Sequence, residues 1–400
     1  MVAYQKKRGD LFLTSLAANF NNHFQAIVLG AGSMGAAACY YLAKRGQKVL
    51  ALEQFTTPHE KGSHAGQSRI IRKAYFEHPD YVPLLERAYE NWRSLEAETR
   101  STFYHKTGIV YFGKPDNENI EGIRKSADLH HIAIENWSRE QYKKLYPAFE
   151  IPADFNTIFE EDAGFVKPEE TITAYILEAK KLGAVVKENT LVLEWKQEAN
   201  KITVITNNGT YTADKLIITA GAWASRMIPQ LNVNLQVTRQ LLAWVRPPDP
   251  DAFSLGNFPC WFVEDPELGS FYGFPSLPQT SSGPIGLKLA HHHPGILSSP
   301  DDIDEIIPSE EEEKLRRFLR KYIPSAGVNI IHTKHCLYTY SPDTHFIIDH
   351  LPDTDKRVTV ACGFSGHGFK FVPVVGEVLA DLAMNGRTDL PIGFLRMRRF

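Results

Sequence analysis

The sequence predicts an α/β fold of two domains, one with a βαβ core and a second, α+β domain with a mixed or antiparallel sheet. Three observations support this. Residues 26–52 read as an apolar strand, a glycine-rich turn, an apolar helix and a second strand. Residues 185–218 alternate like strands, and residues 235–289 contain short strand-like segments separated by proline and glycine. A chain of 400 residues, 43% of them hydrophobic, can bury two cores.

The first βαβ unit contains a dinucleotide-binding pattern. Gly30 allows a tight turn, Gly32 lets the backbone approach a pyrophosphate, and Gly35 lets the helix pack on the strand. Glu53 ends the second strand, where a carboxylate can accept hydrogen bonds from a ribose. GxGxxG alone is weak evidence, but this context predicts a Rossmann-type site with phosphate at a helix N-terminus.

The elements that follow are predicted from periodicity and caps. Residues 56–72 lack periodicity and are expected to form a loop across the cofactor. Helices are expected over 80–98, from Ser138 to before Pro147, over 169–182 after Pro168, and after a capping Ser309. Strands are expected over 237–245, 260–263, 271–274, 285–289 and 358–361, with a last helix through Met384.

Two further glycine turns are expected near the nucleotide. The first includes Gly221 and Trp223 after a strand, and the second is the run 363–368 near the C-terminus. Such a crossover can direct backbone N–H groups at an electron-rich ring edge. Because the sequence has no second GxGxxG for a nicotinamide nucleotide, dioxygen is the simplest electron acceptor.

Composition narrows the partners. A net charge of -3 and the lack of basic runs disfavour nucleic acid and anionic membranes. Four scattered cysteines suit a reducing compartment, and we expect a cytoplasmic protein. No apolar run reaches the roughly 18 residues that cross a bilayer. Residues 1–23 weakly imitate a signal peptide, but Asp10 interrupts the apolar stretch, so a disordered or misassigned leader is the preferred interpretation.

These segments together resemble the monomeric sarcosine oxidase and N-methyltryptophan oxidase family of the D-amino-acid-oxidase superfamily. The resemblance spans residues 25–395 and is carried by the motifs at 30–35 with Glu53, 62–72, 272–275, 286–288, 336–338 with 345–349, and 363–370. It implies a Rossmann-type FAD domain (24–90, 150–228 and 333–386) and a substrate domain (91–149 and 229–332).

The resemblance also implies an activity. The family oxidises secondary amines such as N-methyl amino acids by hydride transfer to flavin N5, and O2 becomes H2O2. Water then hydrolyses the imine to an amino acid and an aldehyde. A small amine and O2 are therefore the expected partners of a monomer. The amine itself stays open among sarcosine, bulkier N-methyl amino acids and pipecolate-like rings.

Site residues follow from the matched motifs. Cys336 matches the cysteine that links covalently to FAD, and Arg72 and Lys370 match the pair that holds the substrate carboxylate. Arg69 matches a flavin-face position and Lys288 a lysine that reaches flavin N5 through water, while Tyr272 and His292 match pocket residues. The expected FAD-binding set is Gly30, Gly32, Ser33, Met34, Gly35, Glu53, Gln54, Ser63, Ser68, Arg69, Gly221, Trp223, Cys336, Gly363, Ser365, Gly366, His367, Gly368 and Lys370.

Alternatives stay open beside this assignment. Ala65 and Gln67 replace a histidine and an acid of close relatives, which could alter flavin attachment. A lone cysteine is more often a buried apolar residue, and an arginine or lysine a surface ion-pair residue. A metal at His291–His293 is not expected, because neighbouring strand residues face opposite sides. A flavin dehydrogenase with another acceptor and a noncatalytic FAD-binding protein are the competing functions.

Overall fold

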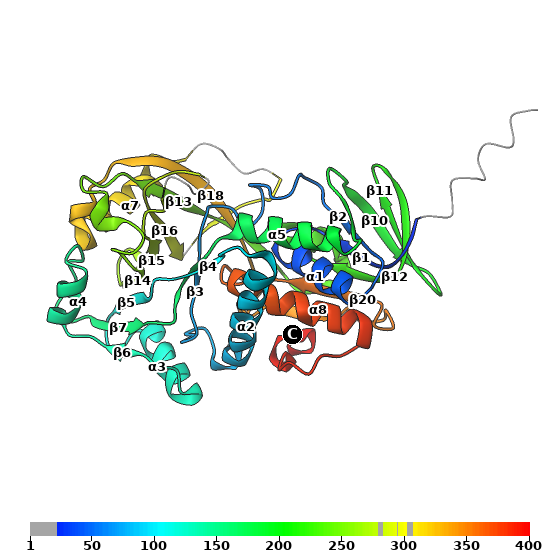
Figure 1. Cartoon of the computed structure of the whole chain (residues 1–400), viewed down its shortest axis with the longest axis horizontal. Coiled ribbons are helices and arrows are strands. Elements are labelled where there is room, and N and C mark those ends of the chain that lie inside the picture. The colour runs from blue at the N-terminus through cyan, green and yellow to red at the C-terminus, as the bar shows by residue number, and fades with distance from the viewer. Residues whose placement is uncertain (1–21, 279–282, 294, 302–306) are drawn as a thin grey trace, which may run out of the picture.

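The computed structural model describes residues 22–278, 283–293, 295–301 and 307–400, so the expected leader lies almost entirely outside the described residues. The described residues form two large sheets, of eight and nine strands, and one small sheet of three. Figure 1 shows the eight-stranded sheet with its helices on the right and the nine-stranded sheet on the left. The α/β fold class is confirmed.

The eight-stranded sheet has a parallel centre. β1 (His23–Leu29) lies between β2 (Val49–Leu52) and β12 (Gly209–Ile218), and it pairs in parallel with both. The parallel set continues with β9 (Val185–Lys187) and β20 (Val358–Cys362), and antiparallel pairs add β10 (Val192–Gln197), β11 (Ile202–Thr206) and β19 (Ile347–His350). β2 and β20 are buried along their whole length, and β1 is buried from Ala26 to Leu29, as is typical of parallel strands covered on both faces.

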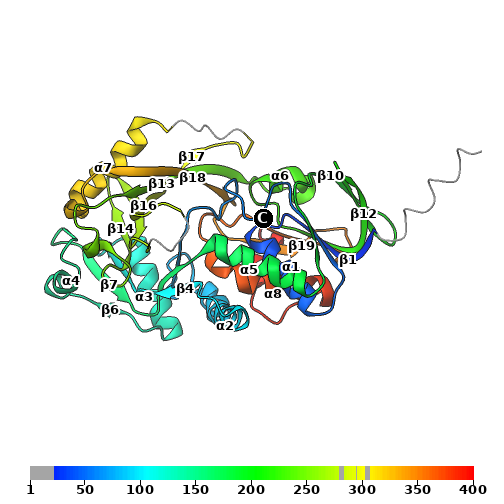
Figure 2. The ribbon, with the colours of Figure 1, turned by 45° about the horizontal axis from the view of Figure 1, so that its top comes forward.

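Three helices cover one face of this sheet. α1 (Ser33–Lys44) packs between α5 (Pro168–Lys181) and α8 (Val372–Asn385), as Figures 1 and 2 show. Gly376 of α8 makes the closest approach, because a Cβ there would lie 2.5 Å from the Ala37 Cβ of α1. The predicted helix after Pro168 is confirmed, and Gly183 (φ 93°) follows its end.

The nine-stranded sheet is antiparallel except where β14 pairs with β5. Its longest pair is β13 (Gln236–Val245) with β18 (Ile330–Tyr340), at the end of the sheet where β17 (Ile296–Leu297) also pairs with β13 (Figure 2). The other strands are β16 (Leu287–His293), β15 (Gly269–Phe274), β14 (Cys260–Asp265), β5 (Ile109–Gly113), β7 (Asn156–Glu160) and β6 (Glu135–Asn136). Four of the predicted strands are thus present, although β16 begins after Ile285.

Helices at the edges complete the fold. α2 (Val82–Thr99) confirms the predicted 80–98 helix and packs on α8, and α3 (Glu118–His130) lies near β5. α4 (Arg139–Leu145) has the predicted Ser138 cap, with a full capping box. α7 (Ser309–Tyr322) differs from its prediction: Pro308 occupies the N-cap, so Ser309 is the first helical residue and caps nothing. The short α6 (Ala224–Met227) follows β12.

The small sheet joins β3 (Arg69–Ile71), β8 (Gly164–Val166) and β4 (Tyr104–Lys106). β3 begins at the end of the glycine-rich loop that includes Ser63 and Gly66, and it pairs with β8, whose next element is α5. Within the described residues, no helix combines the length and the hydropathy that a membrane span needs.

Candidate active site

A cavity of about 430 Å³ runs from the glycine-rich turn before α1 to the nine-stranded sheet. We call it the central cavity. Its lining comes from the turn at 29–34, the end of β2, the loop at 59–64, residues 69–77 of and after β3, residues 190–193 and 219–223, single residues of β14, β15 and β16, residues 337–339 of β18, and the segment 361–370. Because the two ends of this cavity have different linings, it suits an elongated ligand whose two ends differ chemically.

At one end, glycines bring the backbone of α1 against β1. A Cβ at Gly35 would lie 1.8 Å from the Gly30 carbonyl oxygen, and a Cβ at Gly30 would lie 2.6 Å from the Thr219 oxygen. At Gly32, which lines the cavity, a Cβ would meet nothing within 4 Å. Gly30 and Gly35 are therefore needed for packing, whereas Gly32 leaves room for a ligand.

The N-terminus of α1 offers an anion site. Gly32 is the N-cap and no side chain caps the helix, so the amides of its first turn keep no side-chain partner. Ser33 and Met34 line the cavity at this point. A phosphate fits the partial positive charge there.

Glu53 closes the same end, as the spacing predicts. Its Oε2 accepts a hydrogen bond from the Ala31 amide at 2.9 Å, and its Oε1 accepts one from the Phe55 amide at 3.1 Å. The residue is buried but lines the cavity next to Gln54. A carboxylate has about four acceptor positions, so Glu53 keeps acceptors for a diol.

Two histidines beside Glu53 also point to a polar ligand. His59 and His64 line the cavity, and within the described residues neither His59 Nδ1 nor His64 Nε2, both buried, finds a hydrogen-bond partner. Burial and the nearby His59 lower the pKa of His64 to about 4. Buried polar atoms are rarely left unsatisfied, so a bound polar group fits here.

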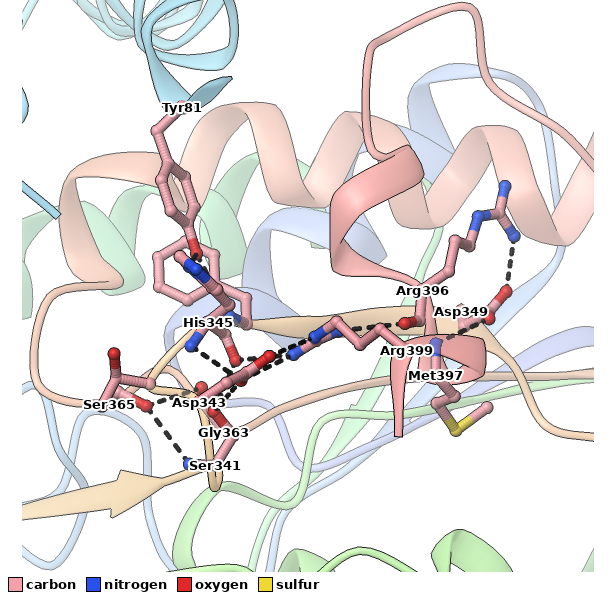
Figure 3. Close-up of polar contacts among 12 residues, drawn as sticks. Tyr81, Ser341, Asp343, His345, Asp349, Gly363, Ser365, Arg396, Met397 and Arg399 are labelled. Carbon is pink, nitrogen blue, oxygen red and sulfur yellow. Dashed lines mark hydrogen bonds and ion pairs between the residues drawn. The ribbon is translucent and has the colours of Figure 1, made fainter. Parts of the chain in front are cut away.

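The C-terminal glycine turn is braced by the end of the chain. Ser365 Oγ accepts a hydrogen bond from the Ser341 amide, and Ser341 Oγ donates to the His345 carbonyl at 2.6 Å. Arg399 pairs with Asp343, and Arg396 pairs with Asp349, so the last residues clamp this region from outside (Figure 3). Gly366 is required for packing, since a Cβ there would lie 2.4 Å from the Tyr338 ring.

Arg69 and Cys336 meet at the wall of the cavity. Arg69 Nη2 lies 3.0 Å from Cys336 Sγ and donates to the carbonyls of Ser63 (3.0 Å) and Ala65 (2.7 Å). Arg69 and Ser63 line the cavity, whereas Cys336, at 1% exposure, lies just behind them. All four cysteines of the chain are free thiols and are buried.

Lys288 lies behind the cavity wall and is not among its lining residues. Its ammonium donates to the Ser68 carbonyl (2.8 Å), to Ser68 Oγ (3.1 Å) and to the Gly66 carbonyl. The Phe274 ring centroid lies 4.5 Å from Nζ. Burial and the Arg69 charge hold the pKa of Lys288 well below its usual range.

At the other end, a buried group of charges surrounds Arg72 and Lys370. Arg72 Nη2 lies 2.6 Å from Glu77 Oε2, and its guanidinium stacks on the Phe76 ring at 3.9 Å. Lys370 donates to the His367 carbonyl at 2.9 Å, and burial followed by the Arg72 charge lowers its pKa to about 7. Burial alone would raise the pKa of Glu77, but Arg72, His367 and Lys370 lower it to about 2.

A set of neutral side chains from β15, β16 and β18 also lines the cavity. His292 Nδ1 lies 3.3 Å from the Tyr338 hydroxyl, which lies 3.4 Å from the Tyr272 hydroxyl. Burial lowers the pKa of His292 to about 3, so the imidazole is neutral at physiological pH. Phe262 packs against His292 and Phe76, and all of these side chains line the cavity. They form an apolar wall with a few polar atoms.

The predicted residues therefore divide into two sets. Most of them line the central cavity: Gly30, Gly32, Ser33, Met34, Glu53, Gln54, Ser63, Arg69, Arg72, Gly221, Trp223, Tyr272, His292, Gly363, Ser365, Gly366, His367, Gly368 and Lys370. Gly35, Ser68, Lys288 and Cys336 lie behind this lining. Four residues outside the predicted set also line the cavity: Phe76, Glu77, Phe262 and Tyr338. Glu77, five residues after Arg72, gave no motif signal.

The cavity fits FAD at both ends. The uncapped helix, the glycine packing and Glu53 suit an adenosine diphosphate, and the orphan histidine nitrogens supply further polar contacts. The wall of Tyr272, His292 and Tyr338 suits a flat ring system with a small substrate beside it.

Comparisons with known proteins agree with this geometry. The family model of FAD-dependent oxidoreductases matches residues 25–382. The chain is 40% identical over 385 residues to monomeric sarcosine oxidase from Bacillus sp. (strain B-0618), covering 95% of this chain and 97% of that protein. It is 33% identical over 380 residues to N-methyl-L-tryptophan oxidase from Salmonella dublin, covering 94% and 99%.

Solved structures share the fold. NikD, an amino acid oxidase of nikkomycin biosynthesis, superposes with a TM-score of 0.83 at 24% identity, covering 94% of this chain and 97% of that chain. L-proline dehydrogenase from P. horikoshii has a TM-score of 0.79 at 24% identity, with the same coverage. The chain belongs to the family of FAD-dependent oxidoreductases.

Proposed function

We propose that this protein oxidises secondary amines that carry a carboxylate, above all N-methyl amino acids, and that O2 is the electron acceptor. The observation that carries the proposal is the buried Arg72 and Lys370 pair at one end of a cavity whose other end is built for a dinucleotide. Two relatives carry names for this chemistry, one for sarcosine and one for N-methyl-L-tryptophan.

FAD, when bound, would accept a hydride at N5 from the carbon next to the amine nitrogen and pass the electrons to O2, giving H2O2. Water would then hydrolyse the imine to an amino acid and an aldehyde. The residues of the chain bind and orient the substrate for this step. Proximity and alignment supply much of the rate enhancement in such reactions.

Arg72 and Lys370 hold the substrate carboxylate in this proposal. Arg72 offers a bidentate fork, and Lys370 adds a compact charge. Glu77 already occupies part of the fork at 2.6 Å, so a bound carboxylate has to share or replace this contact. The two cations and the apolar wall also lower the pKa of a bound amine, which favours the neutral form that can release hydride. Neutral His292 and the tyrosine hydroxyls can accept or donate hydrogen bonds at the amine.

We also propose a covalent link between Cys336 and FAD. The Sγ atom lies 3.0 Å from Arg69 Nη2, directly behind residues that line the cavity. Acid precipitation tests this: yellow colour stays with the precipitated protein, and it moves to the supernatant in C336A. Colour in the supernatant of the unmodified protein would end the covalent proposal and leave FAD binding intact.

A monomer in the cytoplasm, with the domain boundaries given above, completes the proposal. The four free thiols support a reducing compartment. The word monomeric in the names of several relatives supports the assembly state.

A dehydrogenase that passes electrons to a quinone or a protein is the second candidate. It is favoured by the direction of the Lys288 ammonium, which donates to the turn at 66–68 and not into the cavity. Purified protein in air with a panel of N-methyl and cyclic amino acids separates the two. Peroxide formation supports the oxidase, and reduction of an artificial dye without peroxide supports the dehydrogenase. If no amine gives peroxide or reduces the dye, both proposals are overturned.

A further inference from the structure

Charged side chains contact both sides of one turn, residues 65–68, behind the central cavity. On one side, Glu169 in the first turn of α5 accepts hydrogen bonds from the Gly66 amide at 2.6 Å and the Gln67 amide at 3.2 Å. On the other side, the Lys288 ammonium of β16 donates to the Ser68 carbonyl at 2.8 Å and to the Gly66 carbonyl. The turn thus presents its amides to an anion and its carbonyls to a cation.

The backbone of this turn is strained. Gly66 has φ 114° and Gln67 has φ 68°, a left-handed conformation that costs a non-glycine residue roughly 1 kcal/mol or more. A larger residue at Gly66 would have this unfavourable φ and would require Leu242 to shift, since a Cβ there would lie 2.6 Å from Leu242 Cδ1. Such a conformation persists only when its surroundings hold it, and the Glu169 carboxylate bonds to the two amides that this conformation brings together.

The turn also connects the two sheets of the molecule. The Trp244 indole of β13 donates to Gln67 Oε1 at 2.7 Å, and Trp244 pairs with Lys288 in the strand register. The turn is therefore fixed to the nine-stranded sheet on one side and, through Glu169, to helix α5 of the other sheet.

Arg69 and Lys288 bring two positive charges to the same turn. Arg69 donates to the carbonyls of Ser63, Ala65 and Ser68 at 3.0, 2.7 and 2.8 Å. A Cβ built on Gly66 would lie 3.6 Å from both Arg69 Nη1 and Lys288 Nζ, so the cations flank one point of the backbone. Buried like charges repel each other and need a nearby anion. Glu169 counters both, because its charge raises the pKa of Lys288 and of Arg69.

We propose that Glu169 is a positioning residue of the flavin site: it holds the turn at 65–68 so that the turn fixes Arg69 at the cavity wall and Lys288 behind it, and it balances their charge. This rests on the proposed function, in which O2 is the electron acceptor, and on the flavin contacts that the resemblance implies for Arg69 and Lys288. Loss of the Glu169 charge weakens the bonds to the two amides, because a neutral amide oxygen is a poorer acceptor than a carboxylate, and it leaves the cation pair without its counter-ion. Without the Glu169 charge the pKa of Lys288 falls further, so Lys288 loses its proton more easily, and the loosened turn no longer fixes Arg69. Both effects weaken the positive charge that stabilises negative charge developing in the reaction with oxygen.

Glu170 provides the matched control. It is the next residue of α5, has the same charge, and pairs with Lys167 at 3.3 Å with 42% of its side chain exposed. E169Q and E170Q therefore remove one charge each from the same helix turn, but only E169Q affects the turn at 65–68.

Hydrogen exchange of the FAD-loaded protein tests the positioning. Peptides that cover residues 63–69 should exchange at least tenfold faster in E169Q than in the unmodified protein, with no change in E170Q. Equal exchange in E169Q and E170Q would overturn the proposal.

The charge role is tested without any amine substrate. Each protein is bleached with dithionite under nitrogen and then mixed with air-saturated buffer, and the return of flavin absorbance is timed. We expect a rate at least tenfold lower in E169Q and unchanged in E170Q, measured at a temperature where both variants are folded and carry FAD. Equal rates would overturn the charge role. If the unmodified protein itself regains its colour slowly, the oxidase step of the proposed function fails, and hydrogen exchange still decides the positioning role.

Discussion

The two ends of the central cavity are built by different means. The nucleotide end is formed by closely packed glycines, the uncapped N-terminus of α1 and the carboxylate of Glu53. It offers a ligand mainly backbone groups. At the substrate end, buried charged side chains from separate segments neutralise one another, and Glu77 already pairs with Arg72 before any substrate binds. Backbone recognition therefore tolerates little change in shape, whereas side-chain recognition can be tuned by single charges.

The sharpest test of this difference lies at two glycines. G35A should prevent FAD binding and destabilise the FAD-free protein by about 3 kcal/mol or more, because its Cβ would lie 1.8 Å from the Gly30 oxygen. G32A should leave the melting temperature of the FAD-free protein nearly unchanged and weaken FAD binding. Thermal unfolding and FAD titration measure both. Equal behaviour of the two variants would contradict the division into a packing glycine and a ligand glycine.

E77Q should trade stability for ligand affinity. Removing one partner of a buried ion pair costs about 3 kcal/mol, so the ligand-free protein should melt at a lower temperature. A carboxylate inhibitor should bind more tightly, because the Arg72 fork is then free, and it should restore stability. The direction in which this stability changes with pH follows from the lowered pKa of Glu77.

The Glu77 contribution to stability is complete above its ordinary pKa of 4.5 and is lost as the pH falls toward 2. This loss should be present in the unmodified protein and smaller in E77Q, as acid unfolding curves can measure. Unchanged inhibitor affinity in E77Q would show that Glu77 does not compete for Arg72.

R72K should raise KM for an N-methyl amino acid about 10- to 100-fold, since a charged hydrogen bond contributes roughly 1.5–3 kcal/mol. It keeps a positive charge beside Glu77 but loses the fork. K73M, which removes a partly exposed lysine paired with Asp162 at 3.1 Å, is the control and should leave KM within about twofold. Steady-state kinetics decide, and equal KM values in R72K and K73M would move the carboxylate site away from Arg72.

The smallest expected effect is a pH dependence of inhibitor binding. The pKa of Lys370 is lowered to about 7, so Lys370 loses its proton as the pH rises through that value. A carboxylate inhibitor without an amine should therefore bind up to roughly tenfold more weakly at about pH 8 than at about pH 6. K370M should bind weakly at both pH values. A pH-independent affinity in the unmodified protein would contradict the role of Lys370.

The same contrast explains what the sequence could predict. Gly30, Gly35 and Glu53 follow from local chain geometry, which a motif records, and the βαβ unit, α2, α4 and α5 follow from periodicity and caps. Glu77 and Glu169 could not be found in this way, because their partners depend on how the elements fold together. The same holds for Lys288, whose expected direction toward the flavin came from resemblance and whose observed partners are carbonyls of a distant turn.

The capping role of Ser309 failed for a local reason, since Pro308 fits the N-cap position and shifts the helix start by one residue. The aromatic wall of Phe76 and Phe262 carried no motif, and only the tertiary fold brings the two rings to 5.4 Å.

An anaerobic titration tests the central claim most directly. Purified protein that carries FAD is mixed under nitrogen with sarcosine and with other N-methyl amino acids. The absorbance is followed at about 450 nm, the region where flavins absorb. We predict bleaching by at least one of these amines in the unmodified protein, at a much higher amine concentration in R72K. Colourless protein, or a flavin that no such amine bleaches, would contradict the account.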